Sequence, residues 1–171
     1  MKEAIGGTWL FGIVITFIVF FTTFISFSTN YSRTFKVKDE ILTIIERYKG
    51  VNSKTINKIN SELKDMGYFT TGNCVDNSGE KSSPSKNYSN WFGFKTSSTT
   101  ATKNSSKSNY CIRRYLISAA NAGPVGHPSA SYYQVVVFFE LDWPVVGPML
   151  STRVEGETSV IHVFDDTYPF D

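Results

Sequence analysis

The sequence is short of the residues on which most catalytic and metal sites depend. It has only two histidines, His127 and His162, and neither has a partner at metal-ligand spacing. Nucleophile elbows, phosphate loops and paired-histidine motifs do not occur. Neither sign of charge is in large excess. The 17 basic and 15 acidic residues are scattered along the chain and leave a net charge of +2. We therefore expect no enzyme, no cofactor or metal, and no nucleic-acid partner.

Cysteine is equally rare. Cys74 and Cys111 both fall in the part of the chain that we expect outside the membrane, where disulfides persist. An even count there predicts a bond between them. Closing a loop of this length would stabilise the fold by ~4 kcal/mol in the chain-entropy model. Two buried free thiols are the alternative interpretation.

What the sequence does have is one long uncharged run, Thr8–Phe27. Its twenty residues, at about 1.5 Å each, match the roughly 30 Å hydrocarbon core of a bilayer. A cleaved secretory signal is the competing interpretation, but its apolar region would be about 7–15 residues long and would precede a small-x-small site. We expect residues 1–29 to be an N-terminal tail and a retained transmembrane helix, a signal-anchor that crosses the cytoplasmic membrane once and contacts the lipid bilayer.

The orientation of this helix has two opposing indications. Arg33, Lys36 and Lys38 follow the span, and the positive-inside rule would place them in the cytoplasm. The cysteine pair, a loop rich in Ser, Thr, Asn and Lys, and the strand-rich remainder suit the outside of a cell. We expect residues 30–171 to form one extracytoplasmic α+β domain with a disulfide-bounded loop at 74–111.

A helical pattern continues beyond the apolar run without an intervening proline or glycine. Val37, Ile41 and Ile44 share an apolar stripe, and charged residues occupy most of the opposite arc. The sequence therefore predicts one long helix over about 6–49, apolar all round in its first half and amphipathic in its second. Gly50 is expected to end it.

The remaining elements are predicted to be one short helix and an antiparallel sheet. Apolar spacing predicts the helix over about 53–66, with Gly67 as its stop. Aromatic and β-branched runs predict strands within 110–118, 131–143 and 149–163, in a sheet of three or four strands. The amphipathic half of the long helix is expected to cover one face of this sheet, which gives an α+β fold.

A polar stretch at 74–109 is predicted to be a long loop. Its apolar island, Trp91, Phe92 and Phe94, is a candidate binding loop, because aromatic residues are enriched at interfaces. Packing of these rings back onto the sheet is the alternative.

Carboxylates cluster near the end of the chain, at Asp165, Asp166 and Asp171. Acidic groups so close together could hold a hard cation, but their spacing matches no calcium loop. We interpret this segment as a solvated acidic tail.

This plan resembles the pilin and pseudopilin class, including the TadE-like components of bacterial Tad-type pilus systems. The resemblance depends on Gly6-Gly7 before the apolar run, the long helix that follows, and the Cys74/Cys111 pair. The fifth residue after Gly7 is Gly12, where a processed pilin would carry glutamate, so the resemblance is to an uncleaved, membrane-anchored relative. It implies a pilin-like fold and an assembly role in the cell envelope, with other pilin-like or envelope proteins as partners.

Assembly would use the transmembrane helix as a contact surface. Gly12, Thr16 and Thr23 lie on neighbouring parts of one face, where small and hydroxyl side chains permit close approach of a second helix. We therefore expect a structural or assembly component of a pilus-like or secretion-related apparatus. The alternative is a solitary surface-anchored module that binds a ligand through its aromatic loop.

Overall fold

The computed structural model describes residues 2–74, 91–105, 107–117, 130–139 and 152–162. The chain divides into two compact units, Met1–Arg33 and Thr34–Asp171. One helix, α1 (Lys2–Arg47), supplies most of the first unit and enters the second. The boundary lies a few residues beyond the end of the predicted transmembrane segment at residue 29.

Helix α1 confirms the prediction of one continuous helix, and the way it ends follows from its backbone bonds. The Gly50 N–H donates to the Ile45 carbonyl (3.0 Å), and the Lys49 N–H donates to the Glu46 carbonyl (3.2 Å). This pair of bonds defines a Schellman motif, whose left-handed residue is commonly glycine. Here Lys49 takes that conformation (φ 54°), and Gly50 follows it with φ 139°.

Helix α2 (Ser53–Asp65) has a cap at each end. The side chain of Asn52 accepts a hydrogen bond from the Thr55 N–H (2.9 Å), as an N-cap residue should. At the other end Gly67 is left-handed (φ 61°), and the Tyr68 N–H donates to the Leu63 carbonyl. Glycine tolerates this conformation without steric strain, so the prediction of Gly67 as the stop is confirmed.

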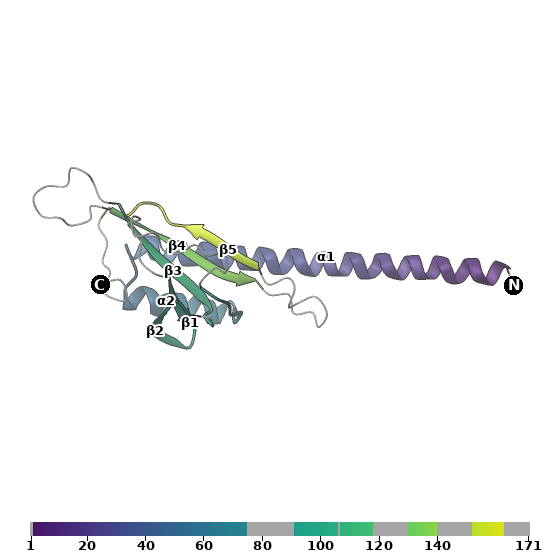
Figure 1. Ribbon diagram of the computed structural model, residues 1–171, viewed down its shortest axis with the longest axis horizontal. Helices are drawn as coiled ribbons and strands as arrows, with labels where there is room; N and C mark the ends of the chain where they lie inside the picture. The colour runs from purple at the N-terminus through teal and green to yellow at the C-terminus, as the bar shows by residue number, and fades with distance from the viewer. Residues whose placement is uncertain (1, 75–90, 106, 118–129, 140–151, 163–171) are drawn as a thin grey trace, which may run out of the picture. The chain divides into compact units, whose positions relative to one another are not determined.

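The second unit contains a five-stranded antiparallel sheet (Figure 1). Its order is β2-β1-β3-β4-β5. The strands are β1 (Phe92–Lys95), β2 (Ser98–Lys103), β3 (Tyr110–Ile117), β4 (Ala130–Phe139) and β5 (Thr152–Glu157). Strands β3, β4 and β5 lie where the sequence predicted strands.

The first two strands correct the prediction of a long polar loop at 74–109. Residues 92–103 form a hairpin, of which β1 pairs with β3. Strand β2 reads Ser-Thr-Thr-Ala-Thr-Lys and is mostly exposed at the edge of the sheet. An edge strand with polar residues on both faces lacks the apolar alternation by which strands are recognised, although its threonines favour extended backbone.

The core lies between one face of the sheet and the two helices, and we call this face the inner face. Buried residues of α1 and α2 pack there against buried residues of the strands, so the amphipathic half of α1 covers the sheet as predicted. The main contributors are Val37, Ile41, Ile44, Ile45, Ile56, Ile59, Leu63, Phe94, Tyr110, Ile112, Tyr133, Val135, Val137 and Val154. The fold is therefore α+β, with a long apolar N-terminal helix and a small antiparallel sheet.

Candidate functional site

In the first unit, the large apolar side chains of α1 are exposed. Trp9 is 75% exposed and Phe20 is 64% exposed, and most other large apolar residues between them are similar. Soluble surfaces rarely present so large a continuous apolar area. Among the described residues, α1 is the helix that is long and apolar enough to cross a membrane, and it fits a transmembrane anchor.

Aromatic side chains mark both ends of the apolar segment. Trp9 lies near its start and Tyr31 near its end, and both are exposed. The 22 steps between them correspond to roughly 33 Å along a helix, close to the thickness of the hydrocarbon core. Trp and Tyr are enriched at the two membrane–water interfaces, so these positions suit interfacial anchors.

Of the three predicted helix-contact residues, Gly12 and Thr16 are exposed on α1 and Thr23 is half-buried. An added Cβ at Gly12 would meet no atom within 4 Å. The Thr16 hydroxyl donates to the Gly12 carbonyl (2.9 Å) and the Thr23 hydroxyl to the Val19 carbonyl (2.7 Å). These bonds satisfy the hydroxyl protons within the helix, so both side chains can enter an apolar environment without an unpaired donor.

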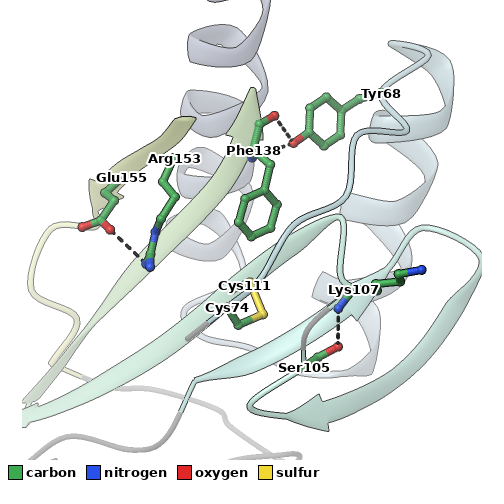
Figure 2. Close-up of a disulfide and its surroundings, with 8 residues drawn as sticks. All are labelled: Tyr68, Cys74, Ser105, Lys107, Cys111, Phe138, Arg153 and Glu155. Carbon is green, nitrogen blue, oxygen red and sulfur yellow. Dashed lines mark hydrogen bonds and ion pairs between the residues drawn. A yellow bond between two sulfur atoms is a disulfide. The ribbon is translucent and has the colours of Figure 1, made fainter. Parts of the chain in front are cut away.

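In the second unit, Cys74 and Cys111 form the predicted disulfide (Figure 2). Both residues are fully buried, with Val136 and Phe138, in a second small core on the face of the sheet opposite the helices. We call this the outer face. The bond ties the chain that follows α2 to strand β3, and much of the segment it encloses, 75–90, lies outside the described residues.

The hydroxyl of Tyr68 pairs with main-chain groups of β4 just beyond the point where β3 begins. Its hydroxyl donates to the Phe138 carbonyl (2.7 Å) and accepts from the Phe138 N–H (2.8 Å), as Figure 2 shows. Pairing of β3 with β4 begins at Tyr110 and Val137, one residue short of Phe138. The hydroxyl thus takes the place of a strand partner for Phe138. Burial raises the pKa of Tyr68, which keeps the hydroxyl protonated and able to donate.

An aromatic and guanidinium network covers the outer face. The guanidinium carbon of Arg113 lies 4.5 Å from the centre of the Trp91 ring, and that of Arg153 lies 5.8 Å from it. Arg113 is also 4.8 Å from the Tyr115 ring, and Tyr115 stacks on Tyr132 with ring centres 4.7 Å apart. Trp, Tyr and Arg are the residues most often found at binding hot spots.

Hydrogen bonds hold this network in one arrangement. Gln134 accepts from the Arg113 guanidinium (2.8 Å) and from the Tyr115 hydroxyl (3.2 Å). Its amide donates to Glu155 (3.3 Å), which also pairs with Arg153 (3.0 Å). Side chains that are already fixed lose little conformational entropy on binding a partner. Sequence reasoning missed this group, because only the strand register brings its members onto one face.

The aromatic island divides between the two faces of the sheet. Trp91 is half-buried on the outer face, beside the disulfide core. Phe92 is partly buried against the inner core, and Phe94 is fully buried there and stacks on Tyr110 with ring centres 5.2 Å apart. Phe94 therefore belongs to the core, as the alternative interpretation held, and Trp91 is the member that lies in the outer-face network.

A polar groove of about 490 Å³ lies between α2 and the β1–β2 hairpin. It is lined by Asn57, Asn60, Ser61, Lys64, Thr96, Ser97, Ser98 and Thr99. Asn60 is engaged in the fold, since its amide donates to the Ser98 carbonyl (3.0 Å) and its oxygen accepts from the Tyr110 hydroxyl (3.1 Å). The described residues that line the groove thus present amides, hydroxyls and the ammonium group of Lys64.

The residues considered for metal binding are not brought together in the described part of the chain. His162 is exposed beyond β5, and no group of three His, Cys, Asp or Glu side chains that could hold a metal ion is found among the described residues. His127 and the acidic tail, Asp165, Asp166 and Asp171, lie outside them.

In comparisons with known proteins, no family model, curated protein or solved structure matches this chain. Its function must therefore be inferred from its own fold and contacts.

Proposed function

We propose that this protein is a membrane-anchored structural or assembly component of a pilus-like or secretion-related apparatus of the bacterial cell envelope. The observation that carries the proposal is the composition of α1. One uninterrupted helix contains both the exposed apolar segment and the stripe that is buried in the core of the sheet domain. A Gly- or Ser-rich linker would let the domain move independently of its anchor, and this chain has none between the two segments.

The pilin-like and TadE-like resemblance is part of the same proposal. An apolar helix that leads into a sheet-covering amphipathic stripe, with a disulfide beside the sheet, supports it. Such a helix would assemble by contact with other helices in the bilayer. Lipid tails are as apolar as leucine, so association depends on close packing and polar contacts, and the open surface at Gly12 permits close packing.

Crosslinking in intact membranes tests this role. A photoreactive residue beside Gly12 should give a ladder of crosslinked products, and Gly12→Ile should reduce the ladder several-fold, because the added side chain separates the helices. Gly7→Ile is the matched control, since it adds the same bulk at an equally open position about 140° round the helix. If Gly12→Ile and a poly-Leu span both assemble as well as the natural helix, the membrane contact is not specific.

The proposal places residues 30–171 outside the cytoplasm, and the buried disulfide supports this side. Protease added to intact cells or spheroplasts should digest the domain. If the domain were fully protected from protease until the cells were lysed, it would lie in the cytoplasm. The positive-inside rule, applied to Arg33, Lys36 and Lys38, would then be correct, and the proposed topology would be wrong.

A solitary surface-anchored binding module is the second candidate, and the outer-face network favours it. Trp91, Arg113 and Tyr115 form a preorganised surface of the kind used in recognition. Crosslinking separates the two candidates. A solitary module should give no ladder of products crosslinked through α1. In such a module, Trp91→Ala should abolish ligand capture while α1 still anchors the protein in the membrane.

A further inference from the structure

The sheet is electrically polarised from one edge to the other. From Trp91 to Ile117, which includes β1, β2 and β3, the sequence has five basic residues and no acidic one. Strand β4 has no charged residue, and β5 carries Glu155 and Glu157 against one arginine. Since the spatial order is β2-β1-β3-β4-β5, one edge is basic and the opposite edge is acidic.

The basic charge is presented to solvent at the β2 edge. Lys95, Lys103 and Lys107 are all exposed on the hairpin and the turn that follows it. Helix α2, which contacts β2, does not cancel this charge, because Glu62 pairs with Lys58 and its remaining charged residues leave a net positive contribution.

The acidic charge is presented at the β5 edge. Glu155 and Glu157 are both exposed. Glu155 pairs with Arg153, and Glu157 lies beyond that pair at the end of β5. Burial, and after it the charge of Glu157, raises the pKa of Tyr132. The neighbouring α1 leaves this sign unchanged. Lys38, which lies under Gly156, pairs with Asp39, and Glu46 accepts from the Ser159 N–H (2.7 Å).

Backbone geometry distinguishes the two edges in a second way. The Thr158 N–H bonds the Tyr133 carbonyl, so, by the alternation of antiparallel pairs, the N–H and C=O groups of Glu155 and Glu157 point away from β4. The β4–β5 register is regular over all of β5. The β1–β2 register shifts between Gly93 and Lys95, which interrupts the opposite edge. Because the β2 edge is interrupted, it cannot form a continuous row of main-chain hydrogen bonds with β5. Contact between the two edges would therefore depend mainly on charged side chains.

We propose that the β5 edge of one copy binds the β2 edge of a second copy. Opposite charges on the two edges make them complementary to each other, whereas two β5 edges or two β2 edges would repel. The contact is heterologous, because each copy uses a different surface, and each bound pair leaves one β2 edge and one β5 edge available. Such contacts give rings or open-ended chains, not closed dimers. This inference rests on the proposed assembly role and names its partner as the protein itself.

Charge reversal on the full chain, reconstituted in liposomes, tests the pairing. Glu157→Lys makes both edges basic, and Lys103→Glu weakens the basic edge, so each variant alone should associate about tenfold less at low ionic strength. An equal mixture of the two single variants should recover association, because the acidic β5 edge of the Lys103→Glu copies then meets the unchanged basic β2 edge of the Glu157→Lys copies. Lys36→Glu is the matched control for Lys103→Glu, since it makes the same change in charge at an exposed position on α1.

Zero-length carbodiimide crosslinking between isotopically light and heavy copies identifies the contact directly. Wild-type copies should give intermolecular products that join the peptide containing Glu157 to a peptide containing Lys95, Lys103 or Lys107. These products should be absent from Glu157→Lys, fall about tenfold in Lys103→Glu, and return in the mixture. Unchanged products in either single variant, products that join β5 to β5, or failure of the mixture to recover them would each overturn the pairing.

The helix contact and the edge contact can fail separately. Loss of the edge products while the ladder through the Gly12 region persists would remove this inference and leave the proposed assembly role. Loss of both would remove the proposed function as well. Thermal unfolding of each variant shows whether the domain remains folded, and an unfolded single variant would be replaced by Glu157→Gln and Lys103→Gln, which should each weaken the products without abolishing them.

Discussion

Removal of a single hydroxyl group, in Tyr68→Phe, is expected to destabilise the domain by more than the usual effect of this substitution. Tyr68 is 5% exposed, and its hydroxyl is the partner of both main-chain groups of Phe138. A typical hydrogen bond contributes only about 0.5–1.5 kcal/mol, because water replaces it in the unfolded state. Here the substitution leaves two buried main-chain groups unpaired, at about 1–3 kcal/mol each, so we expect a loss of about 2–6 kcal/mol.

The assay is urea unfolding of the full chain in detergent micelles, followed by tryptophan fluorescence. The midpoint should fall while the slope with denaturant stays constant, because the buried area hardly changes. Tyr115→Phe is the control, since its hydroxyl belongs to a half-buried side chain, donates to the Gln134 side chain (3.2 Å) and should contribute less than about 1 kcal/mol. Equal, small losses in both variants would refute the reasoning and would mean that water or another group pairs with Phe138.

Three further predictions concern the same domain. Replacing Cys74 and Cys111 together by serine should lower the free energy of unfolding by about 4 kcal/mol in the chain-entropy model, and no loss in urea unfolding would contradict it. Asn109→Asp should cost about 2–4 kcal/mol, because the amide donates to the Phe69 and Thr70 carbonyls and a carboxylate would face both oxygens; unfolding midpoints below those of Asn109→Ala would confirm the repulsion. Burial raises the pKa of Tyr68 and Tyr110, so above about pH 10 the unfolded chain releases protons that the folded chain keeps, and stability should fall by roughly 1.4 kcal/mol per pH unit for each residue. Absorbance at 295 nm should then show at least two tyrosines that ionise only on unfolding, and ionisation of every tyrosine in the folded protein would contradict this.

The apolar part of the fold could be predicted from the sequence because burial leaves a periodic pattern. The stripe at Val37, Ile41 and Ile44 is buried, and β4 is a nearly continuous apolar run. Two helices, three strands and the covered face of the sheet follow from such patterns. The disulfide was predictable for a different reason, since it depends on the number of cysteines and on the compartment.

The polar part of the sheet could not be predicted in this way. Strand β2 has few buried residues. Trp91 and Phe94 belong to the same short stretch of sequence, but they lie on opposite faces of the sheet. The roles of Tyr68 and Gln134 depend on groups far away in the sequence, which only the strand register brings close. No local pattern records such contacts, so the outer-face network was not recognised from the sequence.

The β1–β2 hairpin is held to the sheet by specific links in addition to the apolar core, and these links bear on where the protein is most stable. Phe94 joins β1 to the core that β3, β4 and β5 share. Gly93 lies opposite Cys111, and a Cβ at Gly93 would lie 2.7 Å from the Cys74 sulfur, so the disulfide packs directly on the hairpin. The Asn109 side chain adds a bond to the Thr96 N–H (3.0 Å). Reduction would therefore weaken the hairpin more than the rest of the sheet, and an oxidising compartment outside the cytoplasm is where this half of the sheet is most stable.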